Sequence, residues 1–229
     1  MKTIIITGAN GNLGTAVTKK FLDSGYRVVA TVHDEAGKGE MPASANLEVT
    51  VANLANADES ERFVQGVIAK YSQVHGALML VGGFAGGGIK DTSSADIAKM
   101  FSLNFDTAYN VTRPLYTHMR EKGYGRLVFI GARPALNAVD GKSAIGYGLS
   151  KSLLFKLAEY INAETKHTNV TATVVAASTL DTPPNRKSMP DVDPAKWVRP
   201  EQMADLLELV CSDKADPLRE SVFKVYNNA

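Results

Sequence analysis

The sequence predicts an α/β protein built on a doubly wound parallel sheet of about seven strands, with helices on both faces in a three-layer α/β/α arrangement. Short runs rich in β-branched residues alternate with longer helical stretches along the chain. These runs are apolar on both faces, as expected for strands buried between two layers of helices. Neither an internal repeat nor a long linker divides the chain, so we expect a single domain over residues 1–229.

The elements can be assigned in chain order. The strand runs are 3–7, 26–32, 47–51, 76–81, 125–130, 170–176 and 221–226. The helical stretches are 12–24, 57–73, 94–121, 145–166 and 200–211. Residues 177–200 are the exception, because their prolines forbid regular structure through most of the segment. A loop of this length in a compact domain is usually functional, so we expect it to cover a substrate.

Composition narrows the classes of partner. The chain has 25 basic and 24 acidic residues, and this balance gives no electrostatic footprint for nucleic acid or an anionic membrane. A small-molecule substrate is therefore expected. The single cysteine, Cys211, fits a reducing compartment, and the scattered histidines predict no metal site. The first apolar run is too short for a signal peptide, so we expect a cytoplasmic protein.

A glycine-rich turn, TGANGNLG, follows the first strand and leads into the first helix. In this position, Gly8, Gly11 and Gly14 let backbone N–H groups approach a pyrophosphate, and the helix dipole favours the negative charge. The turn therefore predicts a dinucleotide site.

The end of the second strand does not decide between NADH and NADPH. An acidic residue there commonly binds the adenosine ribose, whereas a basic residue accommodates a 2′-phosphate. Here His33 precedes Asp34. Asp34 disfavours a phosphate, but a protonated His33 or Lys38 would welcome one. The cofactor is expected to be NAD(P)H, with both forms left open.

Tyr147 and Lys151 lie four residues apart in GYGLSK and therefore share one face of the predicted helix. A phenol with a pKa of about 10 is a poor acid–base catalyst near neutrality. A neighbouring ammonium and a nicotinamidium charge favour the phenolate, so we expect a lowered pKa for Tyr147. Such a tyrosine can give a proton to the atom that accepts a hydride.

The glycine turn, Asn104 and the Tyr147/Lys151 pair occur in an order and spacing that resembles the short-chain dehydrogenase/reductase family over nearly the whole chain. The resemblance implies that Tyr147 is the general acid–base, that Lys151 binds the nicotinamide ribose, and that Asn104 holds a water in a proton relay. It also implies that Thr182 contacts the nicotinamide carboxamide. The full set of expected cofactor-binding residues is Gly8, Asn10, Gly11, Asn12, Leu13, Gly14, His33, Asp34, Asn53, Leu54, Gly82, Gly83, Tyr147, Lys151, Thr179 and Thr182.

The chain departs from the family pattern in three places. Asn12 replaces the middle glycine of the usual turn, and VGGFAGGG replaces the asparagine-rich turn after the fourth strand. The catalytic serine is also missing, because Ala132 stands in its place and Arg133 follows. Ser143 could substitute for it, although a helix-capping role is the commoner explanation for a serine there. Arg133 is the other candidate donor.

A narrower resemblance involves the quinonoid dihydropteridine reductases, a branch of that family. It is carried by VGGFAGG, by GARPAL…GYGLSK and by TLDTPPNRKSMPD. This branch also lacks the serine, which implies an acceptor that takes up hydride readily. A general carbonyl or quinone reductase and a non-catalytic dinucleotide sensor stay open as alternatives. The family resemblance further implies a homodimer or homotetramer built on the helices at 94–121 and 145–166.

Overall fold

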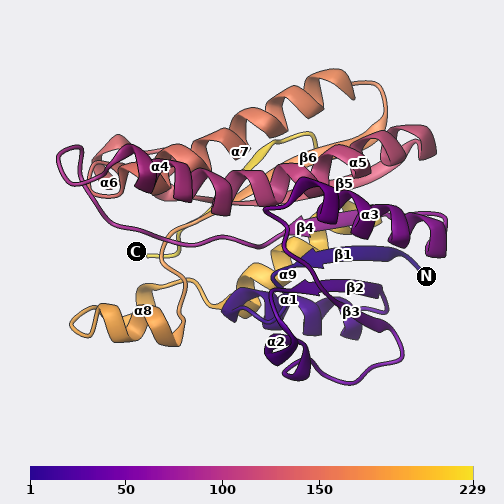
Figure 1. Ribbon diagram of the computed structural model, residues 1–229, viewed down its shortest axis with the longest axis horizontal. Helices are drawn as coiled ribbons and strands as arrows, with labels where there is room; N and C mark the ends of the chain where they lie inside the picture. Colours follow the sequence, from indigo (N-terminus) through magenta and orange to yellow (C-terminus); the bar gives the residue numbers. More distant parts are fainter. Residues whose placement is uncertain (229) are drawn as a thin grey trace.

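A computed structural model describes residues 1–228. Its centre is a seven-stranded, all-parallel sheet in the order β3-β2-β1-β4-β5-β6-β7, with helices on both faces (Figure 1). This is the doubly wound, Rossmann-like fold that the sequence predicts. The strands are β1 (Thr3–Thr7), β2 (Arg27–Val32), β3 (Leu47–Val51), β4 (Gly76–Met79), β5 (Tyr124–Ala132), β6 (Asn169–Ala177) and β7 (Val222–Val225). All seven predicted strands are confirmed, with ends shifted by at most two residues.

The longer helices form the two outer layers. They are α1 (Asn12–Asp23), α3 (Ala57–Tyr71), α4 (Ser94–Phe101), α5 (Thr107–Lys122), α7 (Ile145–Glu164) and α9 (Pro200–Cys211). Short helices lie between them at α2 (Glu35–Gly39), α6 (Ala138–Gly141) and α8 (Pro183–Ser188). The 3₁₀ turns are Arg133–Ala135, Pro194–Lys196 and Asp213–Ala215. Figure 1 shows α1 and α9 on one side of the sheet, with α4, α5 and α7 on the other.

Each face of the sheet has its own core, because successive side chains of a strand point to opposite faces. Ile5 packs with buried residues of α3, α5 and α7, whereas Ile4 and Ile6 pack with those of α1 and α9. At about 25 cal/mol per Å² of apolar surface, burial of each such side chain stabilises the fold by roughly 1.5–3 kcal/mol. None of the helices in the described residues is both long and apolar enough to cross a membrane.

The structure corrects two of the predicted elements. The predicted helix over 94–121 is divided into α4 and α5 by a π-helical turn, Ser102–Asp106, which contains Asn104. The segment 177–200 is less irregular than its prolines suggested, because α8 begins at Pro183 and Pro184. Proline is tolerated in the first turn of a helix, where its missing N–H would have no partner within the helix. Trp197 is buried and so packs this segment against the rest of the protein.

Candidate active site

The glycine turn is folded as a phosphate-binding turn requires. Gly8 has φ +63°, and the N–H of Gly11 donates to the Gly8 carbonyl over 3.1 Å. A Cβ on Gly14 would lie 2.2 Å from the Gly8 oxygen, so no side chain fits between the turn and the start of α1. Residues 12 and 13 then form the first turn of α1, whose backbone N–H groups are free to bind an anion. The residues present therefore fit the diphosphate of a dinucleotide.

The end of β2 is arranged around α2, which the sequence did not predict. Asp34 caps this helix, because its Oδ1 accepts the N–H of Gly37 over 2.8 Å. The amide of Asn10 lies against Gly37, where a Cβ would meet Asn10 Nδ2 at 2.3 Å. His33 is exposed at the strand end. Asp34 therefore has a structural role as the cap of α2, and this role does not require a bound ribose.

The turn after β3 holds Asn53 and Leu54, both expected at the cofactor. The backbone N–H of Asn53 donates to Glu59 over 2.7 Å, and its side-chain oxygen accepts the N–H of Ala55. The Leu54 carbonyl accepts from the buried hydroxyl of Ser60. The side chain of Asn53 therefore shapes the turn itself.

Asn104 clamps the turn after β4. Its Oδ1 accepts the N–H of Gly83 over 2.9 Å, and its Nδ2 donates to the Gly83 carbonyl over 3.1 Å. A Cβ on Gly82 would lie 2.7 Å from that Oδ1 and 3.1 Å from Lys151 Nζ. Asn104, Lys151 and the Gly82–Gly83 backbone thus converge on one point. The side chain of Asn104 is fully buried, and the π turn aims it inward from the helix.

Ser150 links Asn104 to the helix that carries the tyrosine, and sequence reasoning missed it. Asn104 Nδ2 donates to Ser150 Oγ over 3.1 Å, and that hydroxyl donates to the Tyr147 carbonyl over 2.9 Å. Its position in GYGLSK, three residues after Tyr147, was the only available signal. The contacts tie α7 to the π turn and to the β4 turn.

Lys151 is buried, and its ammonium donates to the Ile130 carbonyl on β5 over 2.8 Å. Burial lowers the pKa of Lys151 to about 8, because the charged form loses hydration. The ammonium therefore predominates at pH 7, but with a reduced margin. No carboxylate among the described residues forms an ion pair with it.

Tyr147 does not have the lowered pKa that we expected. Burial raises its pKa to about 12, and no charged group of the protein offsets this effect. The ring of Phe84 packs edge-on against Tyr147, with centroids 5.1 Å apart, although Phe84 is itself 70% exposed. Sequence reasoning missed Phe84, whose large apolar side chain in a glycine-rich loop was the available signal. In the protein alone, Tyr147 is thus a phenol, suited to donating a proton.

The end of β5 has no hydroxyl where the family's serine would lie. Ala132 is buried there, and the next residue, Arg133, forms an ion pair with Asp140 at 3.1 Å. Ser143 is exposed, and the N-cap of α7 is Ala144, so the expected capping role of Ser143 is wrong. The Ser143 carbonyl instead accepts the N–H of Gly87. This contact fixes the loop after β4 beside the start of α7.

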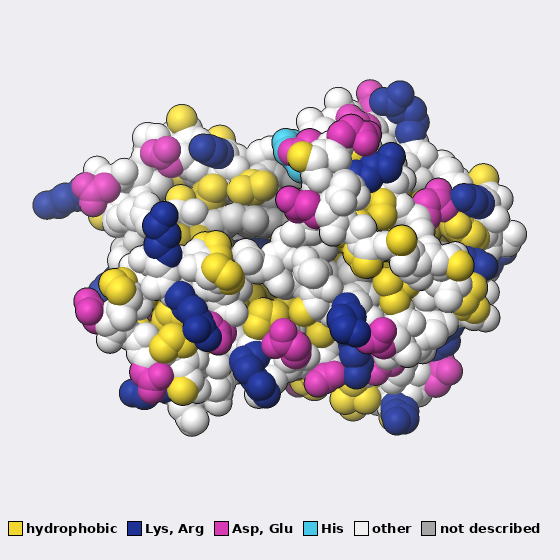
Figure 2. Space-filling model, turned by 90° about the horizontal axis from the view of Figure 1, so that it is seen from below, with side chains coloured by type: hydrophobic (Ala, Val, Ile, Leu, Met, Phe, Trp, Pro, Cys, Tyr) yellow, Lys and Arg dark blue, Asp and Glu magenta, His cyan; other side chains and the backbone are white. Residues whose placement is uncertain are grey.

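The segment after β6 forms the far wall of the site. Thr182 is buried and caps α8 by accepting the N–H of Asn185, which leaves its own O–H free to donate. The carbonyl of Thr179 accepts the N–H of Val198 over 2.9 Å. A cavity of about 420 Å³ lies between this segment and Asn12 on α1. The face drawn in Figure 2 is hollowed near its middle, with acidic and basic side chains interspersed around the hollow.

The fold and this geometry agree with the comparisons. The family model of the short chain dehydrogenases matches residues 2–193. The chain therefore belongs to the short-chain dehydrogenase/reductase family and is an NAD(P)-dependent oxidoreductase. The family membership that the motifs predict is therefore confirmed.

Individual relatives are distant. The 3-oxoacyl-[acyl-carrier-protein] reductase MabA of Mycobacterium tuberculosis strain H37Rv is 25% identical over 236 residues, which cover 98% of this chain and 91% of that protein. Peroxisomal multifunctional enzyme A of Dictyostelium discoideum is 26% identical over 195 residues, so the chain spans 43% of its length. The solved structure of ElxO with NADP bound has a TM-score of 0.90 at 17% identity and covers 98% of this chain and 96% of its own.

Proposed function

We propose that the protein uses NAD(P)H to reduce a planar, conjugated acceptor of the quinonoid dihydropteridine type. The single observation that carries this proposal is Ala132, which leaves the end of β5 without a hydroxyl for a carbonyl oxygen. In comparable sites, such a donor contributes about 3 kcal/mol to stabilising a developing oxyanion. A conjugated imine-like acceptor needs this donor far less than a ketone does.

Tyr147, Lys151 and Phe84 support the same acceptor. When bound, the cofactor supplies the hydride. Tyr147 holds the proton that the reduced acceptor takes up, and its raised pKa keeps the phenol protonated at neutral pH. Lys151 brings a positive charge to the site, where it can orient the nicotinamide ribose. The exposed ring of Phe84 beside Tyr147 offers a flat apolar wall against which a planar ring can stack.

The choice between the two nicotinamide cofactors rests on the end of β2. We propose that His33, rather than Asp34, meets the adenosine ribose, because the carboxylate of Asp34 is engaged by Gly37. This arrangement favours NADPH, and NADP is the cofactor bound to ElxO. The variant His33→Asp should shift the ratio of kcat/KM for NADPH over NADH toward NADH by about tenfold, through repulsion of the 2′-phosphate. An unchanged ratio would place the discriminating residue elsewhere.

The second candidate is a reductase of carbonyl compounds or quinones. It is favoured by the names of the relatives, which include acetoacetyl-CoA reductase and 3-oxoacyl reductases. In this case Ser143 or Arg133 would donate to the carbonyl. Arg133 is held by Asp140 and lies over the ring of Tyr226, and Ser143 is exposed at the rim. Neither observation places a donor beside Tyr147.

The test is steady-state oxidation of NADPH and NADH with quinonoid dihydropterin, simple quinones, acetoacetyl-CoA and ketones. We expect turnover of the pterin to exceed that of the ketones. The matched variant Ala132→Ser restores the hydroxyl, and it should raise ketone turnover about tenfold or more while leaving pterin turnover nearly unchanged. Wild-type activity on ketones without activity on the pterin would contradict the proposal and favour the second candidate.

We also propose that the protein assembles through the layer of α5 and α7. Tyr109 on α5 and Leu149 and Tyr160 on α7 are large apolar side chains that remain exposed. Their burial between copies would remove this surface from water. Light scattering after size exclusion should show a homodimer or homotetramer, whereas a monomer at micromolar concentration would contradict this assembly.

A further inference from the structure

The cavity between α1 and the segment after β6 carries an inference beyond the glycine turn. One wall is Asn12, the first residue of α1, and the opposite wall includes Thr182 and Arg199. A dinucleotide bound at the glycine turn directs its diphosphate to the start of α1. A side chain on the opposite wall therefore faces the region where two negative charges are expected.

The backbone holds Arg199 firmly on that wall. The N–H of Asp181 donates to the Val198 carbonyl over 2.8 Å, and the N–H of Val198 donates to the Thr179 carbonyl over 2.9 Å. The N–H of Arg199 itself donates to Gln202 Oε1 over 3.1 Å at the start of α9. Because α9 packs beside α1 in the same core, Arg199 keeps a fixed position relative to the glycine turn.

The guanidinium of Arg199 forms no ion pair with the other described charged residues of this wall. Arg186 donates to both carboxylate oxygens of Asp181, at 2.6 and 2.8 Å, whereas Arg199 acts on this carboxylate only through a smaller electrostatic effect without a hydrogen bond. Glu201 is exposed and forms no ion pair with Arg199. Within residues 1–228, no group accepts a hydrogen bond or ion pair from the Arg199 side chain. A guanidinium without an ion-pair partner among these residues thus lines the cavity.

We propose that Arg199 binds the cofactor's diphosphate from the side opposite the glycine turn. The planar fork of a guanidinium matches two phosphate oxygens, and such charged hydrogen bonds are stronger than neutral ones. The Arg186–Asp181 pair then has a supporting function, because it keeps the carboxylate from competing for Arg199. This inference rests on the proposed cofactor site but not on the proposed acceptor.

The test compares ligands that differ in the diphosphate. Dissociation constants are measured by calorimetric titration for NADPH, ADP and adenosine with wild type, Arg199→Ala and Arg199→Lys. We expect Arg199→Ala to weaken NADPH and ADP by about tenfold or more and to leave adenosine within about twofold. Arg199→Lys should recover part of the loss, because it keeps the charge without the fork. The weakening should shrink at high salt.

Lys196→Ala is the matched control. Lys196 is an exposed cation three residues before Arg199, and it does not line the cavity. Its removal should leave all three affinities unchanged, which separates a local contact from a loss of overall charge.

The outcomes separate the role of Arg199 from the existence of the cofactor site. Equal ADP affinity in wild type and Arg199→Ala would overturn the role of Arg199 while leaving the glycine turn intact. A loss that is equally large for adenosine would also overturn it, because it would indicate a general disturbance of the site. Binding of neither NADPH nor ADP to wild type would contradict the proposed cofactor site itself. The side chain of Arg199 is exposed, so the thermal midpoint should be preserved in Arg199→Lys even if Arg199→Ala is less stable.

Discussion

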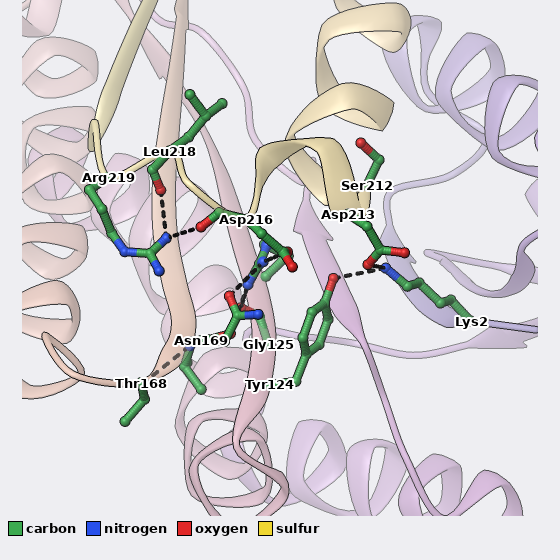
Figure 3. Close-up of polar contacts among 12 residues, drawn as sticks. Lys2, Tyr124, Gly125, Thr168, Asn169, Ser212, Asp213, Asp216, Leu218 and Arg219 are labelled. Carbon is green, nitrogen blue, oxygen red and sulfur yellow. Dashed lines mark hydrogen bonds and ion pairs between the residues drawn. The ribbon is translucent and has the colours of Figure 1, made fainter.

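The two ends of the sheet treat buried charge in opposite ways. At the amino end, polar groups are paired with one another, as Figure 3 shows for Lys2 with Tyr124 and Asp213. Arg126 is 1% exposed there, and its guanidinium donates to Asp216 over 2.5 Å and to Asn169 over 2.8 Å. At the carboxyl end, the buried Lys151 has only a backbone carbonyl as its partner.

The difference separates structural charge from functional charge. A buried charge is stable when it is paired, and it costs stability when it is not. The amino end pairs its charges within the chain, although the buried Nε of Arg126 has no acceptor among the described residues. The carboxyl end leaves Lys151, Tyr147 and Arg199 with capacity for a ligand. Changes at the amino end should therefore affect stability, whereas changes at the carboxyl end should affect activity and binding.

The largest effect is expected at Tyr147. Tyr147→Phe removes the proton donor but keeps the ring that packs on Phe84, so kcat should fall by roughly 10²- to 10⁴-fold. The Tyr147 hydroxyl has no hydrogen bond among the described residues, so the thermal midpoint should hardly change. Stopped-flow oxidation of NADPH and a thermal melt measure the two quantities. A strong loss of stability would place Tyr147 among the structural residues instead.

Lys151→Met should lower kcat/KM by about 100-fold without destabilising the fold, because it removes a buried cation that has no ion-pair partner. Burial lowers the Lys151 pKa from 10.5 to about 8, so the folded protein binds fewer protons than the unfolded chain between these values. Wild-type stability relative to Lys151→Met should thus rise with pH over this window, by up to about 3 kcal/mol.

Wild-type activity should fall over the same rise in pH, as the ammonium is lost. Opposite trends in activity and stability are the signature of this site, and they can be followed by urea unfolding and initial rates from pH 7 to 10. Lys156→Met is the control on the same helix, because Lys156 is exposed and paired with Glu159. Parallel trends in the two lysine variants would argue against a buried ammonium.

Asp216→Ala tests the amino end. It leaves the buried Arg126 without its carboxylate, and we expect a loss of about 2 kcal/mol in the free energy of unfolding. The loss stays below the largest known cases because Asp216 is 42% exposed and Asn169 still accepts from Arg126. The control Asp213→Ala breaks the more exposed pair with Lys2 and should cost less than about 1 kcal/mol. Activity per folded molecule should be unchanged in both, and a lower kcat would break the comparison.

The smallest effect is expected on the stability of the protein at acidic pH. Burial chiefly lowers the pKa values of His75 and His118, whose ring nitrogens accept the backbone N–H groups of Thr3 and Val74. Their contribution to stability is complete above the ordinary pKa of 6.5 and declines as pH falls below it. His118→Gln keeps an acceptor that does not titrate, so it should flatten the loss between pH 6.5 and 5 in urea unfolding curves. An unchanged slope would assign the acid sensitivity to other groups.

The sheet could be predicted from the sequence because its strands are apolar on both faces and are separated by clear helical stretches. The glycine turn and the Tyr147/Lys151 pair could be found for a related reason, since each depends on spacing within one element. Asn104 needed the family resemblance, because its contacts join segments far apart in the chain. Thr182 needed it as well, because its hydrogen bond to the N–H of Asn185 is only a local helix cap.

Other features depend on packing that spacing does not encode. From the sequence we expect the pKa of Tyr147 to fall, but in the folded protein it rises because burial disfavours the phenolate and no charged group of the protein offsets this effect. The sequence does not predict that Asp34 caps a helix, because α2 itself is not predicted. Arg199 was not selected, because its importance arises from the Arg186–Asp181 pair that leaves it free. Tertiary contacts and desolvation therefore decide these positions.

The π turn at Ser102–Asp106 suggests how the helix formed by α4 and α5 acquired its irregular turn. A π turn holds one more residue than the α-helical turn it replaces, so α4 and α5 together resemble one straight helix that has gained a single residue. Deleting one residue there would restore regular winding and rotate Asn104 by about 100° relative to one of the two halves. The Gly83 turn and Ser150 would lose their shared partner, while the helix itself would become more regular.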